Sequence, residues 1–134
     1  MSRILSIDFG DVRIGLAIST ESKIIPKPYK PLANKGTKFV LNELNNICQK
    51  ENISEIIIGK PMMMSGEEGI QVDKVNRFID FIKDKIDAKI ELIDERLTTV
   101  EAEKLIEEKD IRDNIDKDQM AAYYILKDYL EKLS

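Results

Sequence analysis

The order of apolar and polar residues predicts a hairpin at the start of the chain. Ile4–Ser19 reads as two strands that flank a tight turn at Phe9-Gly10-Asp11, because Gly and Asp favour the unusual backbone angles of such turns. The first strand is apolar and ends on a carboxylate, Asp8. The second, Arg13–Ser19, alternates bulky with small side chains, so the hairpin has one bulky and one small face.

Three more stretches carry strand patterns. Ile24–Leu32 contains three prolines, and because proline cannot donate to a sheet ladder we expect an edge strand or an extended arm. Glu55–Gly59 is a short apolar run, typical of a strand that is buried on both faces of a parallel sheet. Lys89–Glu95 is the next strand, and it ends in the carboxylates Asp94 and Glu95.

Four helices are predicted, three from apolar residues at helical spacing and one from a capping box. These cover Lys38–Lys50, Gln71–Asp87, Thr98–Lys109 and Asp116–Leu133, and loops are expected at Pro61–Gly69 and Asp110–Lys117. A capping box, Thr98-x-x-Glu101, starts the third helix. The expected stripe of the second helix is Val72, Val75, Ile79, Ile82 and Ile86. That of the last helix is Ala122, Ile125, Leu126, Tyr129 and Leu133.

The order of these elements predicts the fold class. Three strands come first, and helices alternate with strands after them, which implies parallel strands because a helical crossover returns the chain in the same direction. We therefore expect an α/β fold with a mixed five-stranded sheet. Its first three strands are antiparallel, its later strands are parallel, and helices flank it. A length of 134 residues fits one domain, residues 1–134.

The chain has no histidine and one cysteine, Cys48. These counts exclude a Ser-His-Asp triad, a histidine general base and a histidine-ligated zinc site. The metal chemistry that remains is that of carboxylates with hard cations such as Mg²⁺ or Mn²⁺. A single cysteine suits a reducing cytosol, so we expect a cytoplasmic location. No apolar run is long enough to span a membrane, and the N-terminus lacks the features of a signal peptide.

The net charge of −4 counts against nucleic-acid binding, for which a basic surface is the usual expectation. The charge is uneven, however. Ser22–Asn42 carries no acid and five lysines, which are Lys23, Lys27, Lys30, Lys35 and Lys38. These lysines are either a solvated surface with a local bias or a contact surface for an anionic substrate.

Four carboxylates stand at the ends of predicted elements: Asp8 late in the first strand, Asp94 and Glu95 ending the last strand, and Asp118 opening the last helix. They are expected to converge at one edge of the sheet. Crowded carboxylates repel one another, and divalent cations relieve this repulsion and support phosphodiester hydrolysis. Each acid also has a plainer explanation, since Asp8 can be a turn former, Asp118 a helix-start residue favoured by the dipole, and Glu95 a partner of Arg96.

Five sequence blocks, in order, resemble the YqgF family, also called RuvX. The blocks are Ile7-Asp8-Phe9-Gly10-x-x-Arg13-Ile14-Gly15-Leu16-Ala17, Ile58-Gly59-Lys60-Pro61, Ser65-Gly66-x-x-Gly69, Asp94-Glu95-Arg96-Leu97-Thr98-Thr99-x-x-Ala102 and Asp118-x-x-Ala121-Ala122. They span nearly the whole chain, and the fourth block combined with the first is highly specific. Members of this family are named as nucleases of pre-16S ribosomal RNA and as Holliday junction resolvases.

This resemblance implies a ribonuclease H-like fold and a nuclease that depends on Mg²⁺ or Mn²⁺. The implied substrate is the precursor of 16S ribosomal RNA, with branched DNA as the alternative. Asp8 matches the catalytic aspartate of the first strand, and Asp118 matches the aspartate of the last helix. Glu95, with its neighbour Asp94, matches the acidic block between them. All four are candidate metal ligands, and a strict period of two in the strand lets only one of Asp94 and Glu95 face the site, which favours the longer Glu95.

The resemblance also implies substrate contacts. Arg13 and Arg96 match recurrent arginines, whose guanidinium groups fork onto phosphate oxygens or else form structural ion pairs with nearby acids. Lys60 and Gly15 are further candidate contacts, because Gly15 with Ala17 leaves room for a phosphodiester to approach.

The chain departs from the family pattern at two places. Asp11-Val12 stands where relatives carry Thr or a small residue followed by Lys, so a cation near the site is missing. The segment Asp110–Lys117 has mixed charge where many relatives carry a basic run. Both departures lower the expected phosphate affinity, so that substrate binding either depends on the Lys23–Lys38 arm or is weak.

Two other function classes remain open. One is a nucleotide-binding module of the actin and sugar-kinase type, whose phosphate hairpin also reads Asp-x-Gly, although that architecture needs two such domains. The other is a non-catalytic RNA-binding factor in ribosome assembly, which the acidic balance allows. Either a monomer or a homodimer fits the sequence.

Overall fold

The structure is a computed structural model that describes residues 2–60, 68–94 and 117–133. Five strands form one sheet in the order β3-β2-β1-β4-β5. The strands are β1 Arg3–Asp8, β2 Arg13–Ser19, β3 Pro26–Ala33, β4 Ile53–Lys60 and β5 Lys89–Asp94. β1, β2 and β3 pair antiparallel, whereas β4 is parallel to both β1 and β5. The predicted mixed sheet is confirmed, and the proline-containing β3 lies at one of its edges.

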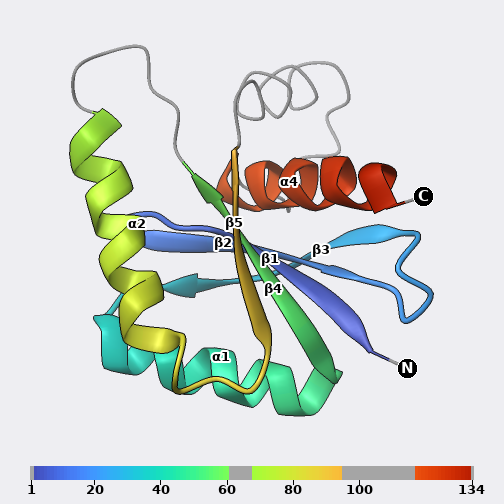
Figure 1. Cartoon of the computed structure of the whole chain (residues 1–134), viewed down its shortest axis with the longest axis horizontal. Coiled ribbons are helices and arrows are strands. Elements are labelled where there is room, and N and C mark those ends of the chain that lie inside the picture. Colours follow the sequence, from blue (N-terminus) through green and yellow to red (C-terminus); the bar gives the residue numbers. More distant parts are fainter. Residues whose placement is uncertain (1, 61–67, 95–116, 134) are drawn as a thin grey trace.

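Helices lie on both faces of this sheet (Figure 1). They are α1 Thr37–Glu51, α2 Glu68–Ile82 and α4 Lys117–Leu133. Helices α1 and α2 cover one face, and α4 crosses the other face above β1, β2 and β3. Helix α1 ends at Asn52, which adopts the left-handed conformation and donates its N–H to the carbonyl of Cys48, so the chain turns directly into β4.

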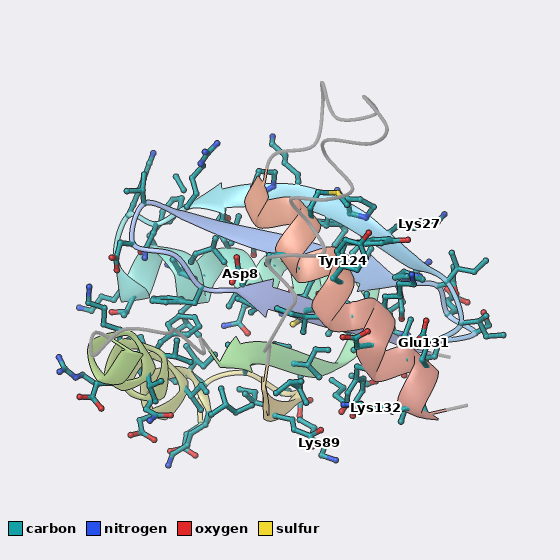
Figure 2. The ribbon with its side chains drawn as sticks, turned by 90° about the horizontal axis from the view of Figure 1, so that it is seen from above. Asp8, Lys27, Lys89, Tyr124, Glu131 and Lys132 are labelled. Carbon is teal, nitrogen blue, oxygen red and sulfur yellow. The ribbon has the colours of Figure 1, made fainter. Side chains whose placement is uncertain are left out.

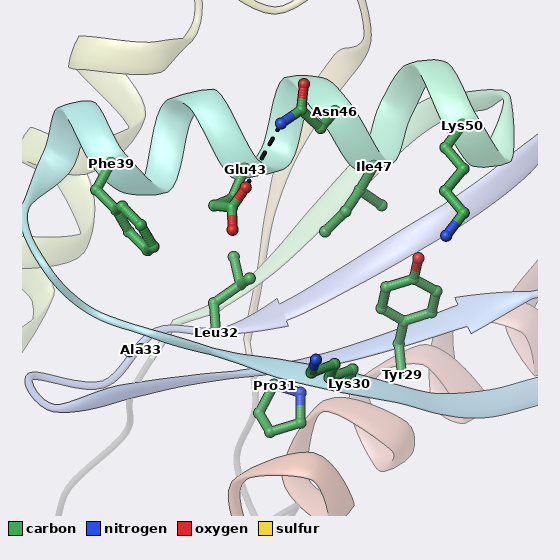
Figure 3. Close-up of a pocket in the computed structure, with 10 residues that line it drawn as sticks. All are labelled: Tyr29, Lys30, Pro31, Leu32, Ala33, Phe39, Glu43, Asn46, Ile47 and Lys50. Atoms are coloured by element: carbon green, nitrogen blue, oxygen red, sulfur yellow. Dashed lines mark hydrogen bonds between the residues drawn. The ribbon is translucent and has the colours of Figure 1, made fainter.

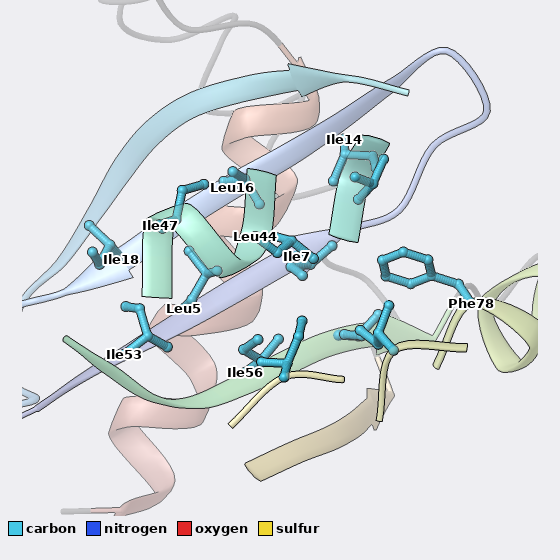
Figure 4. Close-up of a cluster of buried hydrophobic side chains, with 14 of the residues drawn as sticks. Leu5, Ile7, Ile14, Leu16, Ile18, Leu44, Ile47, Ile53, Ile56 and Phe78 are labelled. Carbon is cyan, nitrogen blue, oxygen red and sulfur yellow. The ribbon is translucent and has the colours of Figure 1, made fainter. Parts of the chain in front are cut away.

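The core has two layers because neighbouring residues of a strand point to opposite faces. Leu5 and Ile7 of β1 pack with Leu44 of α1 and Phe78 of α2 (Figure 4). On the other face, a second cluster packs against α4 and includes Ile4, Ala17, Ile57, Ala122, Ile125 and Leu126. In β4, Ile56, Ile57 and Ile58 have no exposed surface, which confirms the strand predicted to be buried on both faces.

Helix α2 differs from the prediction at both ends. It begins at Glu68, inside the segment expected to be a loop, and it ends at Ile82 rather than Asp87. The end is a turn in which Lys85 donates its N–H to the carbonyl of Ile82 and its Nζ to the carbonyl of Phe81, so two last-turn carbonyls find donors there. Ile86 is buried as expected, but from this turn rather than from the helix.

Two predicted apolar stripes also need correction. In α2, Phe78 is 1% exposed and belongs to the core, although the expected stripe did not include it. In α4, Leu133 is 55% exposed, and Leu130 is buried in its place. Leu130 lies one turn after Leu126 and still covers the sheet, whereas Leu133 belongs to the final turn. The predicted helix Thr98–Lys109 lies outside the described residues.

Candidate active site

Asp8 is the last residue of β1 and is half-buried. In the same strand, Ile4 packs in the α4 cluster, and Ser6 donates its Oγ hydrogen to the carbonyl of Ala122 in α4 at 2.6 Å. Because strand residues alternate between faces, Asp8 belongs to the same α4 side of the sheet as Ile4 and Ser6. Figure 2 shows Asp8 at the tip of the β1 arrow, with α4 crossing the sheet.

The ends of three parallel strands meet at one edge of the sheet. β1 ends at Asp8, β4 at Lys60 and β5 at Asp94. The register pairs Ile7 of β1 with Ile58 of β4, and it pairs Lys60 with Asp94. The predicted convergence of Asp8 and the Asp94 position is therefore present in the backbone, at the carboxyl edge where open α/β sheets bind ligands.

The start of α4 lies at the same edge. Two contacts fix the direction of α4, since Ala122 sits beside Ser6 and Tyr129, further along, bonds Glu55 near the start of β4. From the Ser6–Ala122 contact, Asp118 is four residues back along the helix, about 6 Å, and Asp8 is two residues forward along the strand, about 7 Å. The backbone of Asp118 thus lies level with Asp8.

The remaining predicted site residues are distributed as follows. Arg13 is exposed at the start of β2, across the turn from Asp8 and paired with Ala33 of β3. Gly15 pairs with Asp8 in the ladder. Glu95 and Arg96 lie outside the described residues. Among the side chains in the described part of the chain, no group of three or more acids or cysteines gathers closely enough to hold a metal ion.

The small face of β2 has a different use from the one predicted. Ala17 has no exposed surface and packs against Ala122 and Ile125 of α4, and Gly15 is also buried. The expectation that a phosphodiester approaches over Ala17 is wrong, because α4 fills that space. The small residues instead allow the helix to come close to the sheet, and this close approach brings Asp118 toward the Asp8 edge.

The turn after Asp8 is fixed by contacts to α2. The ring of Phe9 lies 4.6 Å from the ring of Phe78, measured between centroids. Lys74 Nζ lies 3.1 Å and 3.2 Å from the two carboxylate oxygens of Asp11. Helix α2 thus places Lys74 beside this turn, where its charge is paired with Asp11, while position 12 carries valine where relatives have lysine.

The same turn is also held from the β3–α1 connection. Asn34 donates its Nδ2 hydrogen to the carbonyl of Gly10 at 2.8 Å, and its backbone N–H to the carbonyl of Val12 at 2.9 Å. A Cβ atom on Gly10 would lie 2.3 Å from the carbonyl oxygen of Arg13, so a side chain does not fit there. Gly10 does not have a positive φ, and close approach rather than backbone angle explains this glycine.

Sequence reasoning did not identify Asn34, Lys74 or Phe78 as part of this region. Asn34 lies between a strand and a helix, where asparagine usually indicates only a turn. Lys74 and Phe78 are one turn apart in α2, which places them on one face of that helix. That spacing was the only signal in the sequence, and it does not indicate which segment they contact.

The donor chemistry at this edge fits a hard divalent cation. Asp8 is a half-buried carboxylate, and the chain brings two further acidic positions, 94 and 118, to the same edge. Oxygen ligands of this kind are those that Mg²⁺ and Mn²⁺ prefer.

No helix in the described residues is long and apolar enough to cross a membrane.

Comparison with solved structures gives the fold. RuvC from T. thermophilus, solved with a Holliday junction substrate, matches with a TM-score of 0.67 at 8% identity, over 98% of this chain and 95% of that one. The Fowlpox virus resolvase, solved with Holliday junction DNA, matches with a TM-score of 0.59 at 16% identity, over 98% of each chain. These matches confirm the ribonuclease H-like fold.

Comparison of sequences gives the family. Proteins named "Putative pre-16S rRNA nuclease" are 38% identical in Clostridium botulinum, over 98% of both chains, and 40% identical in Endomicrobium trichonymphae, over 98% of this chain and 96% of that one. The family model RuvX, described as Holliday junction resolvase, matches residues 2–132. The chain therefore belongs to the RuvX family.

Proposed function

We propose that this protein is a nuclease that hydrolyses phosphodiester bonds, with the precursor of 16S ribosomal RNA as its substrate. The observation that carries the proposal is the convergence of Asp8, the end of β5 and the start of α4 at one edge of the sheet. The names of the relatives support the RNA substrate. The family description supports a four-way DNA junction as the second candidate.

Asp8, Glu95 and Asp118 are the proposed ligands of one or two Mg²⁺ or Mn²⁺ ions. In β5, Glu91 contacts Tyr129 of α4, and Ile93 packs in the α4 cluster. The odd-numbered residues of β5 thus face the Asp8 side of the sheet, and this is why we choose Glu95 over Asp94. When bound, such an ion lowers the pKa of a water molecule and stabilises charge on the leaving oxygen.

The protein's own residues position the substrate. The turn after Asp8 is held by α2 and by Asn34, so the backbone next to Asp8 is positioned before substrate binds. Arg13, exposed at the start of β2 and next to this turn, is the proposed phosphate contact. We propose the same role for Arg96 and Lys60, which lie along the acidic block and at the end of β4.

The test is a cleavage assay on purified protein with Mg²⁺ or Mn²⁺, using a pre-16S 5′-leader RNA and a four-way DNA junction. We expect metal-dependent cleavage of the RNA. The rate should fall at least about a hundredfold in Asp8→Asn and in Asp118→Asn, a loss typical of removing one electrostatic group from an active site. Asp84→Asn, an exposed aspartate in the turn after α2, is the matched control and should cleave like wild type.

Each outcome has a defined meaning. Cleavage that survives Asp8→Asn in a folded protein refutes the proposed site. Preferred cleavage of the junction assigns branched DNA instead of RNA. Binding of the RNA without cleavage under any metal condition favours the non-catalytic assembly factor, and tight ATP binding favours the nucleotide-binding module.

A further inference from the structure

A cavity of about 330 Å³ lies between the edge strand β3 and helix α1, on the face of the sheet opposite α4 (Figure 3). Leu32 of β3 and Phe39 and Ile47 of α1 supply its apolar walls. Glu43 and Asn46 add polar groups, and the Asn46 Nδ2 atom lies 3.5 Å from the Glu43 Oε2 atom. An apolar cavity with a few polar groups is the usual form of a ligand site.

Positive charge surrounds this cavity. Lys30 and Lys50 line it from the two sides. The segment Pro26–Glu51 holds five lysines and two glutamates, whereas the whole chain has a net charge of −4. Of the two glutamates, Glu51 accepts a hydrogen bond from the Tyr29 hydroxyl at 3.0 Å, which ties β3 to the end of α1. A protein of net negative charge thus presents a local cationic surface here, which complements a polyanion.

One end of the cavity lies near the turn that follows Asp8. Ala33 lines the cavity and pairs with Arg13 in the sheet. The next residue, Asn34, bonds both Gly10 and Val12. Asp8 lies on the α4 face of the sheet and the cavity on the opposite face, so a strand of nucleic acid that contacts both would pass around the edge of the sheet at the end of β3.

We propose that the groove between β3 and α1 binds an unpaired segment of the RNA substrate and takes one nucleobase into the cavity. This inference rests on the proposed function for the identity of the polyanion. Lys30 and Lys50 contact phosphates on either side of the base. The base stacks on Phe39, since aromatic side chains are the usual platform for unpaired bases. Lys35 Nζ lies 5.3 Å from the centroid of the Phe39 ring, which adds a cation beside the stacking surface.

Glu43 sets the preference for the base. A carboxylate accepts hydrogen bonds and donates none. Guanine presents two adjacent donors, its ring N–H and its amino group, whereas uracil has no amino group. The groove should therefore prefer a guanine to a uracil at the central position of a short RNA.

The test measures binding in the absence of metal, so that no cleavage occurs. Fluorescence anisotropy would follow a five-nucleotide RNA with a central guanine, its all-uridine counterpart and a duplex of the first sequence. Wild type should prefer the guanine-containing single strand to both others. Lys30→Glu with Lys50→Glu should lower its affinity at least tenfold and reduce the slope of log affinity against log salt by about 1 to 1.5, as expected for two lost phosphate contacts.

Two variants separate the base contacts from folding. Phe39→Leu keeps an apolar side chain and should weaken binding about tenfold through lost stacking. Glu43→Gln should abolish the preference for guanine while leaving the all-uridine affinity unchanged. Lys132→Glu, an exposed charge reversal in the last turn of α4 on the opposite face of the sheet, is the matched control and should bind like wild type.

Wild-type affinity and salt slope in the Lys30→Glu, Lys50→Glu protein would overturn the inference, and so would equal affinity for the duplex. Either result leaves the cleavage assay with Asp8→Asn unaffected. Conversely, an absence of cleavage in that assay does not change how this metal-free binding measurement is interpreted.

Discussion

At the scale of single residues, Tyr129 joins α4 to the parallel strands β4 and β5. Its hydroxyl shares one proton between Glu55 of β4 and Glu91 of β5, and the oxygen of Glu91 lies 3.0 Å away. Burial raises the pKa of Tyr129 above its ordinary value, and the hydrogen bonds and negative charges of the two glutamates raise it further. The phenol thus stays protonated and separates two carboxylates that would otherwise only repel.

Tyr129→Phe should destabilise the protein by about 1–2 kcal/mol, because both carboxylates lose a donor in a partly buried place. Urea denaturation at neutral pH, followed by circular dichroism, measures this change. Tyr123→Phe, on the same helix, is the control and should change stability by less than about 0.5 kcal/mol. Equal effects of the two variants would show that the bonds to Glu55 and Glu91 do not matter.

The raised pKa of Tyr129 also predicts a dependence of stability on pH. A group whose pKa is higher in the folded state contributes stability that is complete below its unfolded value, 10.0, and is lost as the pH rises above it. Wild type should lose stability above pH 10 more steeply than Tyr129→Phe. Parallel curves for the two proteins, measured by denaturation between pH 8 and pH 11, would contradict this assignment.

At the scale of elements, the placement of α4 links packing to the candidate site. Small residues on both sides, Ala17 and Ser6 on the sheet and Ala122 on the helix, allow the helix to approach closely. The Ser6–Ala122 bond also fixes how far along the sheet the helix starts. The position of Asp118 relative to Asp8 is therefore a consequence of this contact.

Ala122→Leu should push α4 away from the sheet and destabilise the protein by about 1–3 kcal/mol, the usual cost of inserting methylene groups into a packed core. Thermal denaturation measures the stability, and the cleavage assay should show a larger loss than the unfolded fraction explains. Leu133→Ala, on the exposed last turn, should change neither quantity. A stable Ala122→Leu protein with normal cleavage would show that the close approach is unnecessary.

At the scale of the whole molecule, two distant segments meet at the turn after Asp8. Phe78 and Lys74 come from α2, and Asn34 comes from the β3–α1 connection. The turn is thus held from both of its sides by elements that belong to the core. The end of β3 also lies between this turn and the β3–α1 groove, because Ala33 lines the groove and pairs with Arg13.

Asn34→Ala should loosen the turn without unfolding the protein, because it leaves the Gly10 carbonyl without its side-chain donor. Hydrogen–deuterium exchange should become faster in residues 9–13, and kcat should fall with little change in KM. Asn46→Ala, an exposed asparagine in α1, is the control for exchange at the turn. Unchanged exchange in Asn34→Ala would contradict the proposal that Asn34 holds the turn in place.

The sequence by itself determined the elements and most of their burial. An apolar run that ends on Asp8 predicted β1, and period-two alternation predicted β2. Prolines identified β3 as an edge, and the apolar run of β4 predicted burial on both faces. The order of elements was enough to predict the mixed sheet, because the crossover rule leaves few alternatives. These features depend on residues that are close together in the sequence, and so they can be predicted from the sequence alone. The four acidic residues, and their match to the motifs of the family, can also be identified in the sequence.

Only the tertiary structure decided how those pieces meet. The turn after Asp8 is held by the pairs Asp11–Lys74 and Gly10–Asn34. The members of each pair are far apart in the sequence, so no periodic pattern of neighbouring residues predicts them. The small residues of β2 were expected to face the substrate, but they face α4. A row of small residues fits an approaching helix as well as a substrate. The end of α2 at Ile82 was missed because the apolar stripe continues through the turn. The surroundings of Asp8 depend on how the helices pack against the sheet, and this packing is a property of the folded chain.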